Sequence, residues 1–140
     1  MPPCGAHSIQ KWPKELQTTS SRCSEVPPSL GDRLTHILTA IGDIRTLLRG
    51  RSRNDFASDL VLRMAIERLF EIISEASRHI PDDLKRQDAT IAWRRLADLG
   101  NWLRHAYHRI DPDILWNMAE NDLEPLKQFV EAIVRSNQAK

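Results

Sequence analysis

Glycine is scarce in this chain, which has five glycines among its 140 residues. No glycine-rich loop of the kind that surrounds a phosphate group is present, and no short alternating apolar run predicts a β-strand. The sequence therefore excludes a Rossmann or P-loop enzyme, because both folds place a nucleotide on a glycine-rich turn that follows a strand.

Cysteine is rarer still. Cys4 and Cys23 are the only two, and two thiols cannot form a disulfide framework or a four-ligand zinc site. They could pair with each other, although two free thiols in a cytoplasmic protein are the simpler interpretation.

Long apolar runs are also missing. No window approaches the ~18 apolar residues of a membrane span. The first residues lack the basic stretch and apolar run of a signal peptide. We therefore expect a cytoplasmic protein that makes no contact with a membrane.

Neither sign of charge is in excess. The 20 basic and 19 acidic residues leave a net charge of +1, so the chain has no global field of the kind that attracts nucleic acid non-specifically. We expect no DNA partner, and any contact with RNA has to be local.

Helical periodicity is the feature that the chain does contain. Residues 1–29 hold five of the eight prolines and show no periodicity, which predicts a disordered N-terminal extension. From Leu30 onward, apolar residues recur at three- and four-residue steps, as they do along one face of a helix. Residues 30–140 are therefore predicted to form one helical domain.

The boundaries of the periodic segments predict an all-α fold, a four-helix bundle with short connections. Pro81 should end the second helix, while Asp111 and Pro112 supply a cap and a first-turn proline for the fourth. The second helix is apolar on two sides, which is typical of a central helix or of one buried in a dimer. The expected helices span residues 30–48, 56–78 and 90–109, followed by a short segment over 114–119 and a longer one over 122–134.

The third helix carries the side chains that are suited to catalysis. At ~100° per residue, its apolar residues from Leu96 to Tyr107 share one arc, which predicts contact with the core. The opposite arc concentrates two cations, an amide and two imidazoles: Arg94, Asn101, Arg104, His105 and His108.

The polar arc has two interpretations. It is either a solvated helix face or a site for RNA cleavage without metal, in which an imidazole takes the proton of a 2′-hydroxyl and a guanidinium stabilises the charged phosphate. His105 and His108 are close enough to share a metal ion. The segment offers no third ligand, however, so we expect neither a metal nor another cofactor.

From Leu30 to Val134 the sequence resembles the HepT-like family of the HEPN superfamily. The resemblance rests on an ordered series of stretches, namely Arg68–Ala76, Ile91–Arg94, Gly100–Tyr107, Asp111–Trp116 and Asn121–Leu126. It implies a helical homodimer whose cleft joins two copies of an Arg-x4-His motif and cleaves RNA without metal. The histidine of that motif falls on His105.

The same resemblance implies a partner. In the family, an MntA-like nucleotidyltransferase antitoxin attaches AMP to a tyrosine and so silences the toxin, and this tyrosine falls on Tyr107. Periodicity places the Tyr107 ring toward the core, where a phenol usually keeps its hydroxyl at the edge.

The chain departs from the family motif at its arginine, because Gly100 stands five residues before His105. Arg104 follows Gly100 by four residues, so it lies only about 40° around the helix and could reach the same cleft. Two hypotheses follow. The chain is an endoribonuclease that uses His105, Arg104 and a positioning Asn101, or it is an inactive HEPN dimer that binds protein or RNA.

Overall fold

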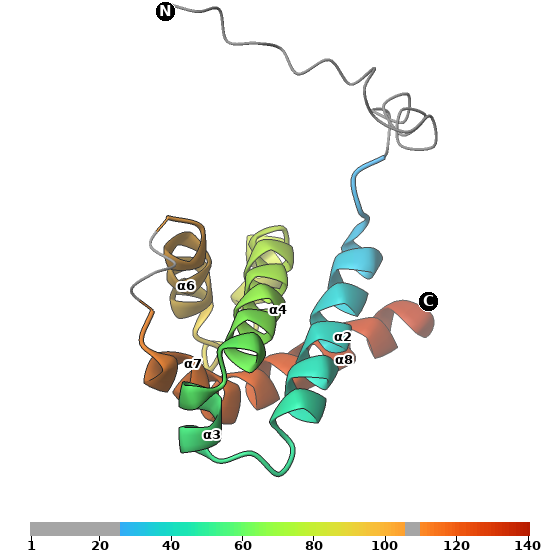
Figure 1. Ribbon diagram of the computed structural model, residues 1–140. Coiled ribbons are helices and arrows are strands. Elements are labelled where there is room, and N and C mark those ends of the chain that lie inside the picture. The colour runs from blue at the N-terminus through green and yellow to red at the C-terminus, as the bar shows by residue number, and fades with distance from the viewer. Residues whose placement is uncertain (1–25, 106–109) are drawn as a thin grey trace, which may run out of the picture.

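The computed structural model describes residues 26–105 and 110–140, and every regular element in these two ranges is an α-helix. The predicted all-α class is confirmed. The predicted N-terminal extension lies mostly outside the described residues. The helices, labelled as in Figure 1, are α2 (Leu30–Leu48), α3 (Arg53–Ser58), α4 (Leu60–Arg78), α5 (Asp82–Lys85), α6 (Trp93–His105), α7 (Pro112–Asn121) and α8 (Leu123–Gln138).

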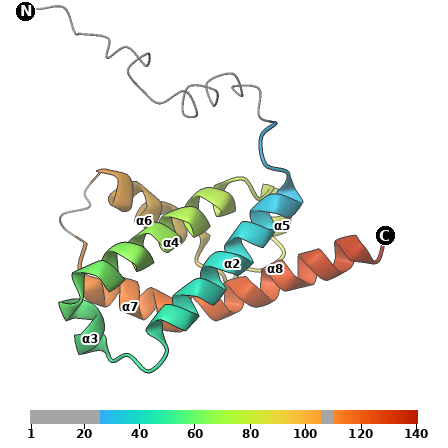
Figure 2. The same ribbon diagram turned by 45° about the vertical axis from the view of Figure 1, so that its right-hand side comes forward.

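Helix α4 is the centre of the bundle. It lies between α2 and α6 and contacts both, while α7 and α8 run across beneath this row of three helices (Figures 1 and 2). One continuous core fills the space between the two layers and includes Leu34, Ile37, Ile66, Phe70, Leu99, Leu115 and Val130. None of the helices in the described part of the chain is long and apolar enough to cross a membrane.

The first helix has the predicted bounds because a capping box starts it. The Ser29 hydroxyl accepts a hydrogen bond from the backbone N–H of Asp32, and the Asp32 carboxylate accepts one from the backbone N–H of Ser29. These two bonds satisfy N–H groups that a helix start leaves unpaired. Helix α2 therefore begins at Leu30.

The prediction of a single second helix over residues 56–78 is wrong. The chain forms α3 and then α4, with Asp59 between them in an extended conformation. The Asp59 carboxylate accepts a hydrogen bond from the backbone N–H of Leu62 at 3.0 Å, so Asp59 caps the start of α4. Hydrophobic periodicity continues across this break and conceals it. Pro81 ends the helix as expected, since α4 stops at Arg78.

The third helix begins later than predicted. Asp88 and Thr90 form a turn through side-chain hydrogen bonds, and α6 starts at Trp93. The preceding short helix α5 is not predicted by the sequence pattern. The expected end at residue 109 lies outside the described residues.

The last two helices follow the prediction closely. Asp111 caps α7, and Pro112 occupies its first turn. The break falls at Asp122, where the longer segment is predicted to begin. Pro125 lies in the first turn of α8, where its missing N–H removes no helical hydrogen bond.

The two apolar sides of the second helix have different environments. One side is the buried side of α4, formed by Leu62, Ile66, Phe70 and Ile73. The other side carries three exposed residues at its N-terminal end, Leu60, Val61 and Met64, of which Val61 is 77% exposed. The single chain therefore leaves an apolar surface uncovered on its central helix.

Candidate active site

Helix α6 packs on α4 through the apolar arc that the sequence predicts. Leu96, Leu99 and Leu103 are buried, and Gly100 is buried among them. The predicted members of this arc at residues 106 and 107 lie outside the described residues. The buried arc sets the orientation of α6 and directs its polar residues away from the core.

Helices α6 and α4 approach each other closely at Gly100. A Cβ atom built on Gly100 would lie 2.0 Å from the Ser74 Oγ and 2.7 Å from the Ser74 Cβ. Both distances are far below van der Waals contact, so position 100 requires glycine while Ser74 stands opposite. This close packing is internal to one chain and does not involve a second copy.

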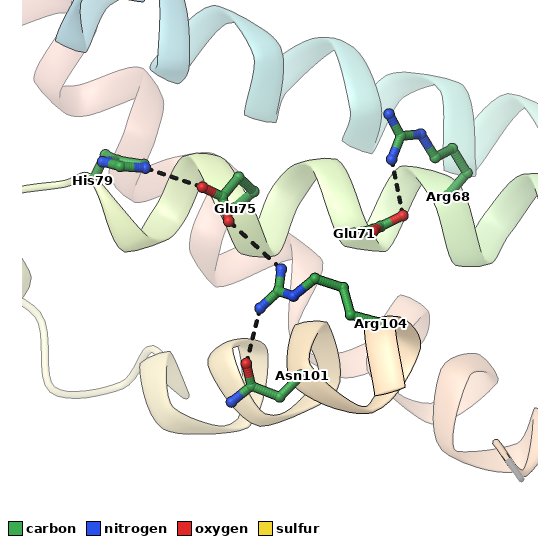
Figure 3. Close-up of polar contacts among 6 residues, drawn as sticks. All are labelled: Arg68, Glu71, Glu75, His79, Asn101 and Arg104. Atoms are coloured by element: carbon green, nitrogen blue, oxygen red, sulfur yellow. Dashed lines mark hydrogen bonds and ion pairs between the residues drawn. The ribbon is translucent and has the colours of Figure 1, made fainter. Parts of the chain in front are cut away.

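The Arg104 guanidinium lies between Asn101 of α6 and Glu75 of α4 (Figure 3). Its Nη2 donates a hydrogen bond to Asn101 Oδ1 at 2.8 Å, and its Nη1 lies 3.5 Å from Glu75 Oε2. The same Nη1 is 3.7 Å from the place where a Cβ of residue 100 would stand. Arg104 therefore reaches back along α6 by one turn, and its side chain is only 27% exposed.

Glu75 links α4 to this arginine. Its Oε1 lies 3.1 Å from His79 Nε2, which leaves Oε2 for Arg104 (Figure 3). The hydrogen bond with His79 lowers the pKa of the Glu75 carboxyl, and the charges of Arg78 and Arg104 act in the same direction. Glu75 is therefore ionised at neutral pH and forms a charged pair with Arg104.

An open cleft of about 380 Å³ lies beside this pair, between α2, α4 and α6. A second ion pair in the cleft joins Arg68 to Glu71 at 2.9 Å, one turn before Glu75. The charged and titratable side chains that line the cleft are Arg33, His36, Arg68, Glu71, Glu75 and Arg104.

The His105 side chain is exposed, and no hydrogen bond or ion pair joins it to another residue in the described ranges. It follows Arg104 directly, so the two side chains leave α6 about 100° apart. The structure thus joins Asn101 to Arg104 but does not bring His105 to them. Tyr107 and His108 lie outside the described residues. Arg94 is a solvated side chain, 3.9 Å from Asp98.

The tryptophans in the described ranges are either partly buried against the core or exposed. Trp93 packs edge-on against Phe129, and Trp116 packs against Phe56. Trp102 is half exposed and lines a separate cleft between α6 and α7. In the ranges that the structure describes, no three His, Cys, Asp or Glu side chains gather as a metal site.

Sequence reasoning missed Glu75 and Ser74. Both residues lie in Arg68–Ala76, one of the stretches that carry the family resemblance, but nothing local distinguishes them from other polar residues of a helix. Their importance comes from the packing of α4 on α6, which periodicity alone cannot align residue by residue.

Glu75→Gln should reduce stability at neutral pH. The pKa of Glu75 in the folded protein is below its usual 4.5, so its carboxylate stabilises the fold above that value, and this contribution disappears as the pH falls through the folded-state pKa. Because Glu75 is 53% exposed, the contribution should stay below about 1 kcal/mol. Thermal melts at pH 7 and at the lowest pH where both proteins stay folded check this. An equal difference at both pH values would contradict it.

Comparisons with known proteins identify the family to which the chain belongs. The family described as Ribonuclease HepT-like matches residues 37–133. The chain is 38% identical to a protein named "Probable ribonuclease HepT" from Thermococcus cleftensis, over 69% of this chain and 87% of that one. It is 32% identical to a provisionally named RNase of Methanocaldococcus jannaschii, over 71% and 92% of the two chains. No solved structure matches the chain.

Proposed function

Because the chain belongs to the ribonuclease HepT-like family, we propose that it is a metal-independent endoribonuclease and the toxin of a toxin–antitoxin pair. Its antitoxin would be an MntA-like nucleotidyltransferase that silences it by AMP transfer. RNA as the substrate and ATP as the AMP donor both imply that it acts in the cytoplasm.

The position of the Arg104 guanidinium is the observation that supports this proposal most directly. The family motif needs an arginine where this chain has Gly100. The Nη1 of Arg104 lies 3.7 Å from the place where a Cβ of residue 100 would stand. Arg104 thus supplies a cation beside the position that the motif assigns to one. One of its five N–H donors forms a hydrogen bond with Asn101, and its Nη1 pairs with Glu75 at 3.5 Å, so N–H donors remain for a phosphate.

In the proposed reaction the RNA 2′-hydroxyl attacks the adjacent phosphorus and gives its proton to His105. The bond from phosphorus to the 5′-oxygen breaks, and that oxygen takes a proton from solvent water, to which His105 returns the proton that it accepted. Arg104 stabilises the negative charge that accumulates on the phosphate oxygens in the transition state. Asn101 holds the guanidinium through its side-chain oxygen. The products are a 2′,3′-cyclic phosphate and a 5′-hydroxyl end.

A second copy of the chain would complete the site. Within one chain, His105 and Arg104 leave α6 in directions about 100° apart, so a single copy does not place both on one phosphate. The exposed Leu60, Val61 and Met64 offer an apolar surface on the central helix for self-association. We therefore include a homodimer in the proposal.

Val61→Glu combined with Met64→Glu should convert the dimer to a monomer, because two carboxylates would lose their hydration at the interface. Sedimentation velocity measures the change. Leu47→Glu, at another exposed apolar residue, on α2, is the matched control and should leave the dimer intact. A wild-type protein that sediments as a monomer would remove the homodimer from the proposal.

Tyr107 is the proposed site of AMP transfer. Incubation with the nucleotidyltransferase, ATP and magnesium should add the mass of AMP to the peptide that contains Tyr107, and Tyr107→Phe should abolish the addition. Peptide mass spectrometry reports both results. AMP on another residue would move the site, and no transfer would remove this form of regulation.

Cleavage of RNA by the purified chain in the presence of EDTA tests the central claim. We expect fragments that end in a 2′,3′-cyclic phosphate, because no other product follows from attack by the 2′-hydroxyl. RNA binding without cleavage would instead favour the inactive binding module.

A further inference from the structure

The Arg104 side chain needs restraint from outside its own helix. Its chain of single bonds gives the guanidinium a wide range of positions, and a useful phosphate cation has to be held in one of them. Asn101 contacts it at 2.8 Å but lies three residues earlier on the same helix. That contact orients the guanidinium relative to α6 and not relative to α4.

Glu75 supplies the contact that crosses between the helices. Its Oε2 lies 3.5 Å from Arg104 Nη1, and this pair ties the end of the side chain to α4. The pair holds the guanidinium on the α4 side of α6, directly above Gly100, where no side chain of residue 100 competes for the space.

The two oxygens of Glu75 have separate partners. Oε1 contacts His79, one turn later on α4, and Oε2 faces Arg104 (Figure 3). The contact with His79 restricts rotation of the carboxylate and so fixes the direction of Oε2. A chain of contacts therefore runs from His79 through Glu75 and Arg104 to Asn101.

The neighbouring acid of the cleft does not share this arrangement. Glu71 lies one turn before Glu75, and its carboxylate pairs with Arg68 at 2.9 Å. No hydrogen bond or ion pair joins Glu71 to Arg104 among the described residues. The two glutamates line the same cleft, but only one of them restrains Arg104.

We propose that Glu75 is a positioning residue, whose carboxylate holds the Arg104 guanidinium over Gly100 in the geometry that receives the RNA phosphate. This inference rests on the proposed ribonuclease function for its catalytic consequence. The restraint of Arg104 itself does not depend on that function.

Glu75→Ala and Glu71→Ala form a matched pair of variants, since each removes one carboxylate from the same face of α4. In Glu75→Ala we expect kcat to fall by roughly 10- to 100-fold, because a displaced catalytic group loses much of its effect. KM should change little, since Arg104 keeps its charge. Glu71→Ala should lower kcat far less, because Glu71 lines the same cleft but pairs with Arg68 and not with Arg104. Unchanged kcat in Glu75→Ala, or an equal loss in both variants, would overturn the proposal.

A second measurement is independent of cleavage. The Nε–H signal of Arg104, assigned by its loss in Arg104→Lys, reports the order of the guanidinium by NMR relaxation. We expect an ordered signal in the wild type and in Glu71→Ala, and a mobile one in Glu75→Ala. If the wild type does not cleave RNA, the ribonuclease proposal fails while this measurement still decides whether Glu75 restrains Arg104. An equally ordered signal in all three proteins would overturn the positioning role.

Discussion

His105→Ala is expected to reduce RNA cleavage by about 10²- to 10⁴-fold, the usual cost of removing a general base. The imidazole of His105 is exposed and has no polar partner among the described residues. Its loss should therefore change the free energy of unfolding by no more than about 0.5 kcal/mol, which is typical of exposed substitutions. Initial rates on a defined RNA, together with thermal melts, separate the effect on chemistry from any effect on folding.

Arg104→Ala should reduce cleavage as well, and Arg94 provides its control. Both arginines lie on the same polar arc of α6. The Arg94 side chain, however, is exposed to solvent, and its ion pair with Asp98 is long, at 3.9 Å. Arg94→Ala should therefore keep the wild-type rate.

Equal rates for the wild type and His105→Ala, with both proteins folded, would remove the catalytic assignment and leave a binding module.

Gly100→Ala should destabilise the protein by about 2 kcal/mol, the middle of the range for forcing extra atoms into a packed interface. The new Cβ would stand 2.0 Å from the Ser74 Oγ and 2.7 Å from its Cβ, so the helices α4 and α6 would have to separate. Alanine is the better helix former by about 1 kcal/mol, and this gain offsets part of the cost. Denaturant unfolding measures the net change.

Gly42 is the matched control for this substitution. It lies within α2, and nothing stands within 4 Å of the point that an added Cβ would occupy, so Gly42→Ala should stabilise the protein. Ser74→Gly should relieve much of the clash in Gly100→Ala, which a double-mutant cycle would show as favourable coupling. If Gly100→Ala proves as stable as Gly42→Ala, the close approach of α4 and α6 is wrong.

The packing at Gly100 also changes how the family motif should be tested. Gly100→Arg restores the arginine of the motif in sequence. Its Cβ would clash with the Ser74 side chain, however, and the rest of the new side chain would displace the guanidinium of Arg104. We expect this variant to lose stability and cleavage together. The substitution therefore cannot show whether Arg104 is a good replacement, whereas Arg104→Ala can.

Local signals in the sequence determined much of the fold. The start of α2 at Leu30 and the Asp-Pro start of α7 both depend on interactions within one helical turn, and each lies where the sequence predicts it. The apolar arc of α6 is equally clear, because burial recurs with the helical period. The break at Asp59 is missed because the apolar pattern continues through it.

The arrangement of the candidate site was decided by the tertiary structure alone. The sequence identified Asn101, Arg104 and His105 as residues of one polar arc and showed that Gly100 departs from the family motif. It could not show that Gly100 faces Ser74 or that Glu75 pairs with Arg104. Periodicity reports which side of a helix is buried, but the register between two packed helices depends on which side chains are small enough to let them approach. Here a glycine opposite a serine sets the α4–α6 contact, and that contact places Glu75 beside Arg104.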